Sequence, residues 1–349
     1  MLLDPILTTQ PPEVEAAGAE QLAKRYYGID LQAAELAGER DRNFRMDAAD
    51  GRQFLLKISN PAEDEGMVDL QISLLEHVRS RDPGLPVPRM VPTMGGRPAI
   101  PILLADGRSA ILRMLTYLPG APLSAVARST RQRQALGRCL ARLDLALAGF
   151  DHPAARHELL WNVSTAQRLG GMVASLPDPD RRARVDRFMT RYVADILPLL
   201  DHLRAQMIHN DFNLGNVLVR PDATDEVAAI IDFGDAVSAP LAGEIATAAA
   251  YQLTDCEAPL LGAAEMIGAY HGVLALSDEE LDLIPDLLEA RLVITVLITE
   301  WRATRYPENR QYIMRNNRPA WNGLDALGRM SRGQIQDQLL QFCHAGEMR

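Results

Sequence analysis

Two short polar motifs in the second half of this 349-residue chain constrain its fold more than any other feature. The first, His209–Asn216, carries Asp211 near its start. The second is Asp232-Phe233-Gly234, which begins sixteen residues after Asn216. The β-branched runs between the motifs predict a hairpin, so we expect the chain to return Asp232 toward Asp211.

The order H-x-D-x-x-x-x-N, then a strand, then D-F-G, fits the arrangement of kinases. Phosphoryl transfer needs in-line positioning and neutralisation of charge more than covalent help. We predict that Asp211 orients an attacking hydroxyl and accepts its proton. Asn216 and Asp232 are predicted to bind Mg²⁺, a hard cation that suits amide and carboxylate oxygens. His209 and Asn213 are expected to hydrogen-bond the loop into shape.

The rest of the chain predicts a small β-rich lobe followed by a larger helical lobe. The early elements are a helix at 16–27, strands at 31–36, 43–46 and 53–58, a helix at 63–79, and strands at 99–104 and 109–115. Helices dominate from residue 124, with one interruption at 207–232. The predicted class is α+β, a protein-kinase-like two-lobed fold with an antiparallel N-lobe and a mainly helical C-lobe. Its predicted parts are a leader at 1–15, an N-lobe at 16–116 and a C-lobe at 117–349.

Lys57 ends an apolar strand and fits the lysine that holds the α- and β-phosphates of the nucleotide in kinases. The helix that follows offers Glu65, Asp69 and Glu76 as carboxylate partners, of which we favour Asp69. Gln71 stands where related sequences often have Glu.

The nucleotide-covering loop has no glycine-rich motif here, and the chain has no P-loop motif. The stretch 38–44 occupies that place, and Asn43 with neighbouring backbone N–H groups is expected to contact phosphates. The purine is expected to hydrogen-bond the backbone at Met114 and Thr116. These residues do not distinguish ATP from GTP.

The chain resembles the aminoglycoside phosphotransferase and choline kinase superfamily from about residue 20 to residue 330. Lys57, His209-Asn210-Asp211, Asn216 and Ile231–Asp235 carry the resemblance. A helix is expected within ten residues of Asp232, which leaves no room for the activation loop of a protein kinase. The chain is similar in particular to hydroxylysine kinases and to related sequences fused to aminotransferases, through 36–44, 55–60, 115–120 and 160–162. It departs from them at Asn210, where Gly is common, and at Gln71.

The resemblance implies a small-molecule kinase that transfers the γ-phosphate of ATP or GTP, with Mg²⁺, to a hydroxyl of an amino alcohol or a 5-hydroxylysine-like amino acid. Asp235 and Glu244 are predicted to face the acceptor ammonium, and Arg302 or Arg305 an acceptor carboxylate. Homoserine, choline, ethanolamine or an aminoglycoside are alternative acceptors. The alternative from another class is a catalytically inactive nucleotide-binding scaffold, which would have no chemical need for all the motif residues.

Bulk properties exclude several classes of protein. A formal net charge of −10 without a Lys/Arg block disfavours a nucleic-acid partner. Neither a signal peptide nor an apolar run of ~20 residues is evident, so we expect a cytoplasmic enzyme that does not bind membranes. Three scattered cysteines indicate reduced thiols rather than a disulfide framework or a metal site.

Overall fold

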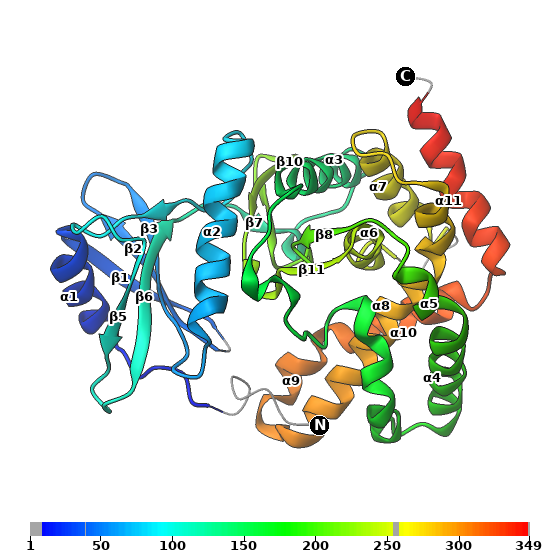
Figure 1. The fold of residues 1–349 in the computed structure, drawn as a ribbon, viewed down its shortest axis with the longest axis horizontal. Coiled ribbons are helices and arrows are strands. Elements are labelled where there is room, and N and C mark those ends of the chain that lie inside the picture. The colour runs from blue at the N-terminus through cyan, green and yellow to red at the C-terminus, as the bar shows by residue number, and fades with distance from the viewer. Residues whose placement is uncertain (1–8, 39, 254–257, 348–349) are drawn as a thin grey trace. The chain divides into compact units, whose positions relative to one another are not determined.

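The computed structural model describes residues 9–38, 40–253 and 258–347, which form two compact units (Figure 1). Unit 1 contains the chain up to Gly120 together with His152–Ala154 and Ala228–Gly234. Unit 2 contains Ala121–Asp151, Ala155–Val227 and the chain from Asp235 onward. Residues 1–8 of the predicted leader lie outside the described part. The short segment 228–234 is notable because it places Asp232 in unit 1, whereas Asp211 belongs to unit 2.

Unit 1 is built on a six-stranded antiparallel sheet in the order β1-β2-β3-β6-β4, with β5 also pairing with β6. The strands are β1 (Leu31–Leu36), β2 (Arg42–Ala48), β3 (Gln53–Ile58), β4 (Met90–Val91), β5 (Ala99–Leu103) and β6 (Ser109–Thr116). The helices α1 (Ala16–Tyr27) and α2 (Glu65–Arg81) lie on opposite faces of this sheet (Figure 1).

The period-2 alternation of β3 divides its side chains between the two faces. Phe54, Leu56 and Ile58 are buried in one core with residues of α1. Leu55 and Lys57 face the other side, where they line a pocket with residues of α2. β3 is mostly apolar, but it places the charged side chain of Lys57 on the face of the sheet that α2 covers.

The predicted boundaries in unit 1 agree with the structure where a local signal marks them. α1 ends at Gly28, whose φ of 70° is a left-handed cap that glycine adopts without strain. α2 starts two residues later than predicted because the side chain of Asp64 accepts the N–H of Gly66 and caps the helix. The two-residue strand β4 was missed because periodicity needs a longer run.

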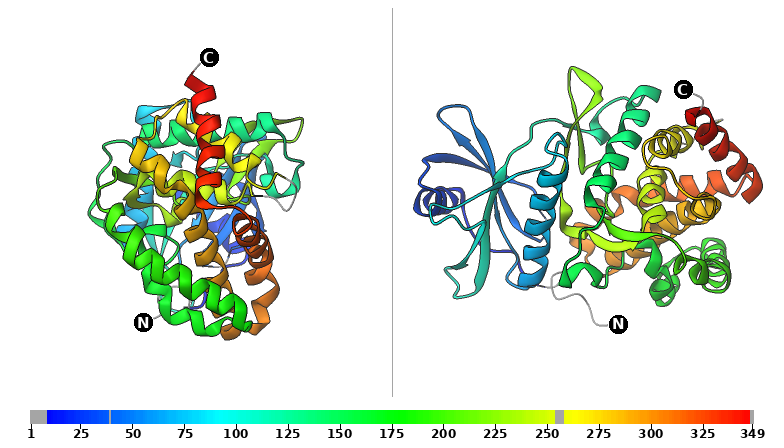
Figure 2. Two further views of the ribbon diagram at one scale, coloured as in Figure 1. Left: turned by 90° about the vertical axis from the view of Figure 1, so that its right-hand side faces the viewer. Right: turned by 45° about the horizontal axis from the view of Figure 1, so that its top comes forward.

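Unit 2 is mainly helical. Its α-helices are α3 (Thr130–Leu147), α4 (Pro179–Arg191), α5 (Leu197–Leu200), α6 (Leu241–Ala250), α7 (Leu261–His271), α8 (Asp278–Arg305), α9 (Arg310–Ile313), α10 (Asn317–Leu327) and α11 (Arg332–Glu347). Figure 2 shows α11 at the surface of this unit, where it packs on α7 and α8. None of the described helices is long and apolar enough to cross a membrane.

The strands of unit 2 form two small sheets. One is β10 (Ala223–Ile230), β9 (Val217–Arg220) and β7 (Ala121–Pro122), and the other pairs β8 (Ala205–Ile208) with β11 (Val237–Pro240). The last three residues of β10 are counted with unit 1. The predicted interruption by short strands at 207–232 is present and extends to Pro240, because β11 follows the second motif and pairs with β8.

The 28-residue helix α8 is buried along most of its length. It begins with a capping box, in which the Ser277 hydroxyl accepts the N–H of Glu280 and the Glu280 carboxylate accepts the N–H of Ser277. Among its buried residues is Arg291, which is only 2% exposed. The guanidinium of Arg291 reaches the carboxylate of Asp211.

Candidate active site

The loop between β8 and β9 holds Asp211 with its own side chains. The Nδ2 of Asn216 donates to the Oδ2 of Asp211 at 2.7 Å and to its backbone oxygen at 3.1 Å. The Nδ1 of buried His209 accepts the N–H of Asp211 at 3.2 Å. The Oδ1 of Asn213 accepts the N–H groups of Gly215 and Asn216 at 2.7 and 3.1 Å. His209 and Asn213 thus make contacts of the kind expected of loop-structuring side chains.

The backbone of Asn210 adopts a conformation that suits glycine and that asparagine can also adopt. Its φ of 62° lies in the left-handed region, which glycine adopts freely and asparagine tolerates better than most residues. Its N–H donates to the Oε2 of Glu244 at 2.6 Å, and both residues are fully buried. Glu244 therefore anchors the loop, and the prediction that it faces a substrate ammonium is wrong because protein atoms cover its side chain completely.

Burial raises the pKa of Glu244 to about 8, with a further upward contribution from Asp211 that the Asn210 N–H and Arg291 oppose. Between the ordinary value of 4.5 and about 8, the carboxyl is protonated in the folded chain and ionised in the unfolded chain. Because the folded state then binds more protons, the free energy of unfolding falls as the pH rises through this range.

Glu244→Gln is expected to remove this contribution, because the glutamine oxygen still accepts the Asn210 N–H but does not titrate. The Tm of the variant minus that of the wild type should rise with pH across the range and level off above pH 8. Thermal unfolding at several pH values measures it, with the exposed Asp69→Asn as control. Parallel Tm curves for wild type and Glu244→Gln would contradict the burial argument.

In unit 1, Lys57 is paired with Asp41 and not with the predicted Asp69. Its Nζ lies 3.3 Å from the Oδ2 of Asp41, in the connection between β1 and β2. The Oδ1 of Asp41 accepts the N–H of Asn60 at 3.0 Å, which fixes the carboxylate from its other side. Asp69, with a side chain that is 69% exposed, binds the Nε2 of His152 at 3.0 Å instead. The prediction of Asp69 was wrong because helix periodicity gives no information on a residue that the pairing of β2 with β3 brings beside Lys57.

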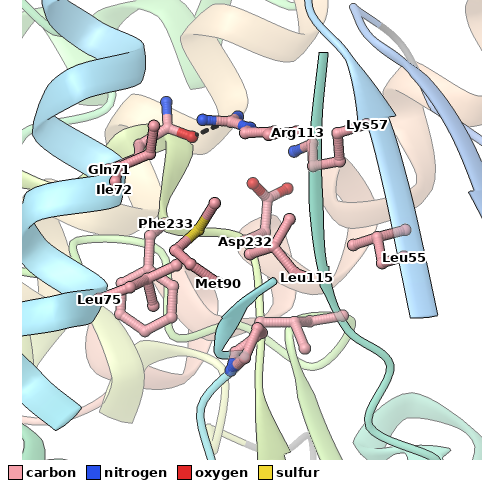
Figure 3. A pocket seen from close by; sticks show the side chains of 12 residues that line it. Leu55, Lys57, Gln71, Ile72, Leu75, Met90, Arg113, Leu115, Asp232 and Phe233 are labelled. Carbon is pink, nitrogen blue, oxygen red and sulfur yellow. Dashed lines mark hydrogen bonds between the residues drawn. The ribbon is translucent and has the colours of Figure 1, made fainter. Parts of the chain in front are cut away.

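A pocket in unit 1 brings Lys57 together with Asp232 (Figure 3). Its lining consists of Leu55, Lys57, Gln71, Ile72, Leu75, Pro88, Met90, Arg113, Leu115, Ile231, Asp232 and Phe233. The pocket is apolar on one side and charged on the other, where the carboxylate of Asp232 points toward the head groups of Lys57 and Arg113 (Figure 3). Asp232 also has a positive φ of 63°, so the backbone turns sharply to present this side chain.

The residues predicted to bind Mg²⁺ have suitable donor atoms. Asp232 supplies a carboxylate, and Asn216 supplies Oδ1, because its Nδ2 is engaged with Asp211. Within the described residues, no group of three or more His, Cys, Asp or Glu side chains is placed to hold a metal ion. Mg²⁺ usually keeps several waters and takes further oxygens from substrate phosphates, and its binding by these two residues stays a prediction.

Comparison with known proteins agrees with this chemistry. Residues 33–276 match the model of the phosphotransferase enzyme family, which is more than half of the chain. The chain belongs to the phosphotransferase enzyme family. Curated relatives include hydroxylysine kinase from Mus musculus, 26% identical over 93% of this chain and 92% of the relative, and from Danio rerio, 24% identical over 95% and 96%.

Solved structures support the fold of this small-molecule phosphotransferase. An amicoumacin kinase superposes with a TM-score of 0.62 at 16% identity, covering 91% of this chain and 92% of the other. A microcompartment-associated aminopropanol kinase also gives 0.62 at 16% identity, covering 92% and 98%. The predicted two-lobed, kinase-like class, with an antiparallel sheet in one lobe and helices in the other, is confirmed.

Arg291 is the residue of this phosphotransferase that sequence reasoning missed. Its guanidinium donates to the carbonyl of Trp161 at 2.7 Å and to the hydroxyl of Tyr251 at 2.9 Å. It also lies 3.4 Å from the Oδ1 of Asp211 and over the rings of Trp161 and Tyr251, at 5.3 and 5.6 Å from their centroids. A buried cation held by Trp161 and Tyr251 thus orients the Asp211 carboxylate. The signal was present as a lone arginine before the apolar run Leu292–Ile298.

The predicted acceptor-binding residues are spread over unit 2. Asp235 interacts electrostatically with Arg291. Burial alone would lower the pKa of the Arg291 guanidinium, but the contributions of Tyr251, Asp211 and Asp235 raise it above its ordinary value. Arg305 is exposed and stacks on the ring of Trp301 at 4.0 Å, and Arg302 is half-buried on the same helix. The role of these two arginines toward an acceptor stays a prediction.

Two backbone N–H groups of the predicted purine-binding segment donate hydrogen bonds within the protein. The N–H of Thr116 donates to the carbonyl of Arg89 at 2.9 Å, and that of Tyr117 to the carbonyl of Gln53 at 3.2 Å. Met114 is fully buried in β6. Asn43 lies directly opposite Lys57 in the pairing of β2 with β3. Contacts of these residues with a nucleotide stay predictions.

Proposed function

We propose that this phosphotransferase transfers the γ-phosphate of a purine nucleoside triphosphate to the side-chain hydroxyl of an amino acid of the 5-hydroxylysine type. The observation that carries the proposal is the similarity to hydroxylysine kinases over more than nine tenths of both chains. The set of Asp211, Asn216, Asp232 and Lys57 supports the reaction itself. A scaffold that only bound nucleotide would need neither Asp211 nor the arginine that orients it.

In the proposed mechanism, Asp211 aligns the acceptor hydroxyl and takes its proton as the hydroxyl oxygen bonds to the γ-phosphorus, while the bond from that phosphorus to the β-phosphate oxygen breaks and nucleoside diphosphate leaves. A loose transition state depends more on the alignment of the attacking hydroxyl than on a strong base. Arg291 and Asn216 hold the Asp211 carboxylate that provides this alignment. Lys57 binds the α- and β-phosphates. Asn216 and Asp232 would hold Mg²⁺, which neutralises charge on the phosphates when bound. Asn43, Met114 and Thr116 are proposed to contact the nucleotide, and Asp235 with Arg302 or Arg305 the acceptor.

We propose either ATP or GTP as the phosphate donor. The amicoumacin kinase was solved with AMP-PNP, and an aminoglycoside 2′-phosphotransferase-IIIa with a TM-score of 0.54 was solved with GDP. The residues of the purine-binding segment contribute backbone groups, which suit either base.

Purified protein with Mg²⁺ and either ATP or GTP, offered 5-hydroxylysine, homoserine, choline, ethanolamine and kanamycin separately, tests the proposal. We expect phosphorylation of 5-hydroxylysine with the highest kcat/KM, measured by mass spectrometry of the product and by release of nucleoside diphosphate. Lysine, which lacks the hydroxyl, is the matched control and should give no product. Preference for another acceptor would replace the proposed substrate, and hydrolysis without transfer to any of them would overturn it.

A further inference from the structure

Two cationic side chains lie side by side on the α2 face of the unit 1 sheet. Lys57 of β3 and Arg113 of β6 are direct partners in the antiparallel register. Residues paired in this way project from the same face with their Cβ atoms about 5 Å apart. Like charges at such positions normally destabilise a sheet, so the pair calls for a compensating function or partner.

Arg113 is hydrogen-bonded to a neutral side chain on α2. Its Nη2 donates to the Oε1 of Gln71 at 2.7 Å, in a hydrogen bond that is buried and shown in Figure 3. Gln71 stands on α2. An amide oxygen orients a guanidinium without cancelling its charge, whereas a carboxylate would cancel it. Lys57 in contrast has a carboxylate, that of Asp41.

Arg113 is 4% exposed, yet it lines the same pocket as Lys57 and Asp232. Burial lowers the pKa of this guanidinium, and the carboxyl groups of Asp41, Glu63 and Asp232 oppose that effect. Because the guanidinium of arginine stays protonated in proteins, the side chain keeps its charge. The pocket therefore presents two neighbouring cations beside Asp232.

We propose that Arg113 is a second phosphate-binding cation of the nucleotide site, oriented by Gln71 and acting beside Lys57 on the triphosphate of the donor. This proposal rests on the proposed function for the identity of the ligand. A planar guanidinium is suited to it because it binds two phosphate oxygens at once, which a lysine ammonium does not. The neutral Gln71 is then a specific element of the site, since an acid there would compete with phosphate for Arg113.

The test compares the dissociation constants of ATP, ADP and adenosine by isothermal titration calorimetry, in the presence of Mg²⁺ and without any acceptor. The variants are Gln71→Glu, Arg113→Gln and, as the matched control on the same helix, Asp69→Asn. We expect Arg113→Gln to weaken ATP binding by about 10- to 100-fold, the range for hydrogen bonds to charged groups, and to leave adenosine binding unchanged. Gln71→Glu should weaken ATP binding several-fold, and Asp69→Asn should have no effect.

Equal losses for ATP and adenosine, or no loss in either variant, would overturn the role of Arg113. Gln71→Glu decides the matter if Arg113→Gln fails to fold, because it is nearly isosteric and leaves Arg113 in place. In that case an unchanged ratio of ATP to adenosine affinity overturns the proposal. Since no acceptor is used, these results are separate from the choice of substrate, and a wild-type protein that bound no nucleotide would refute the proposed function itself.

Discussion

Asp211→Asn is expected to lower kcat by about 10²–10⁴-fold, the usual contribution of a positioned proton acceptor. Asparagine keeps an oxygen for the Nδ2 of Asn216 but cannot take the hydroxyl proton. Nucleotide binding should be unchanged, because Asp211 is proposed to act on the acceptor. Steady-state kinetics and nucleotide titration of the same preparation separate the two effects.

The variant also leaves the buried guanidinium of Arg291 without its carboxylate, which lies 3.4 Å away in the wild type. A lower Tm is therefore expected as well, and residual activity has to be measured well below it. Asp222→Asn is the matched control, because Asp222 is an exposed acid of the β9–β10 connection that pairs with Arg220. Near-wild-type kcat in Asp211→Asn would show that the proton goes elsewhere.

Asp232→Asn is expected to lower turnover to a similar extent and, unlike Asp211→Asn, to weaken the binding of Mg²⁺-nucleotide. The reason is that an amide replaces the single carboxylate proposed as a metal ligand. Titration of ATP with Mg²⁺ and again with EDTA measures the effect of the metal. The wild type should gain affinity from Mg²⁺, and the variant should lose most of that gain. An identical gain in both proteins would remove Asp232 from the metal site.

Much of the fold was predictable because its signals are local. α1, β1 and β3 have the predicted bounds, since each combines a clear periodicity with a turn or a glycine at its end. The hydrogen-bonded catalytic loop was predictable for the same reason, because His209, Asn213 and Asn216 act on residues only a few positions away.

The contacts that were missed join residues far apart in the sequence. Asp41 directly precedes β2, which pairs with the strand of Lys57, and Arg291 reaches Asp211 from a helix eighty residues further along the chain. Glu244 was predicted to face the acceptor ammonium, yet it makes a fully buried contact with the loop that carries Asp211. Periodicity and motif spacing describe neighbours along the chain, so tertiary pairs of charged groups lie beyond them.

The ion pair of Lys57 with Asp41 has a consequence for regulation. In protein kinases the carboxylate that holds this lysine comes from the helix after its strand, so moving the helix switches the enzyme on and off. Here the carboxylate lies between β1 and β2 and is fixed by the backbone of Asn60, independently of α2. Displacement of α2 would leave the pair of Lys57 and Asp41 in place, whereas it would remove the contact of Gln71 with Arg113. We therefore expect the orientation of Lys57, unlike that of Arg113, not to depend on the position of α2.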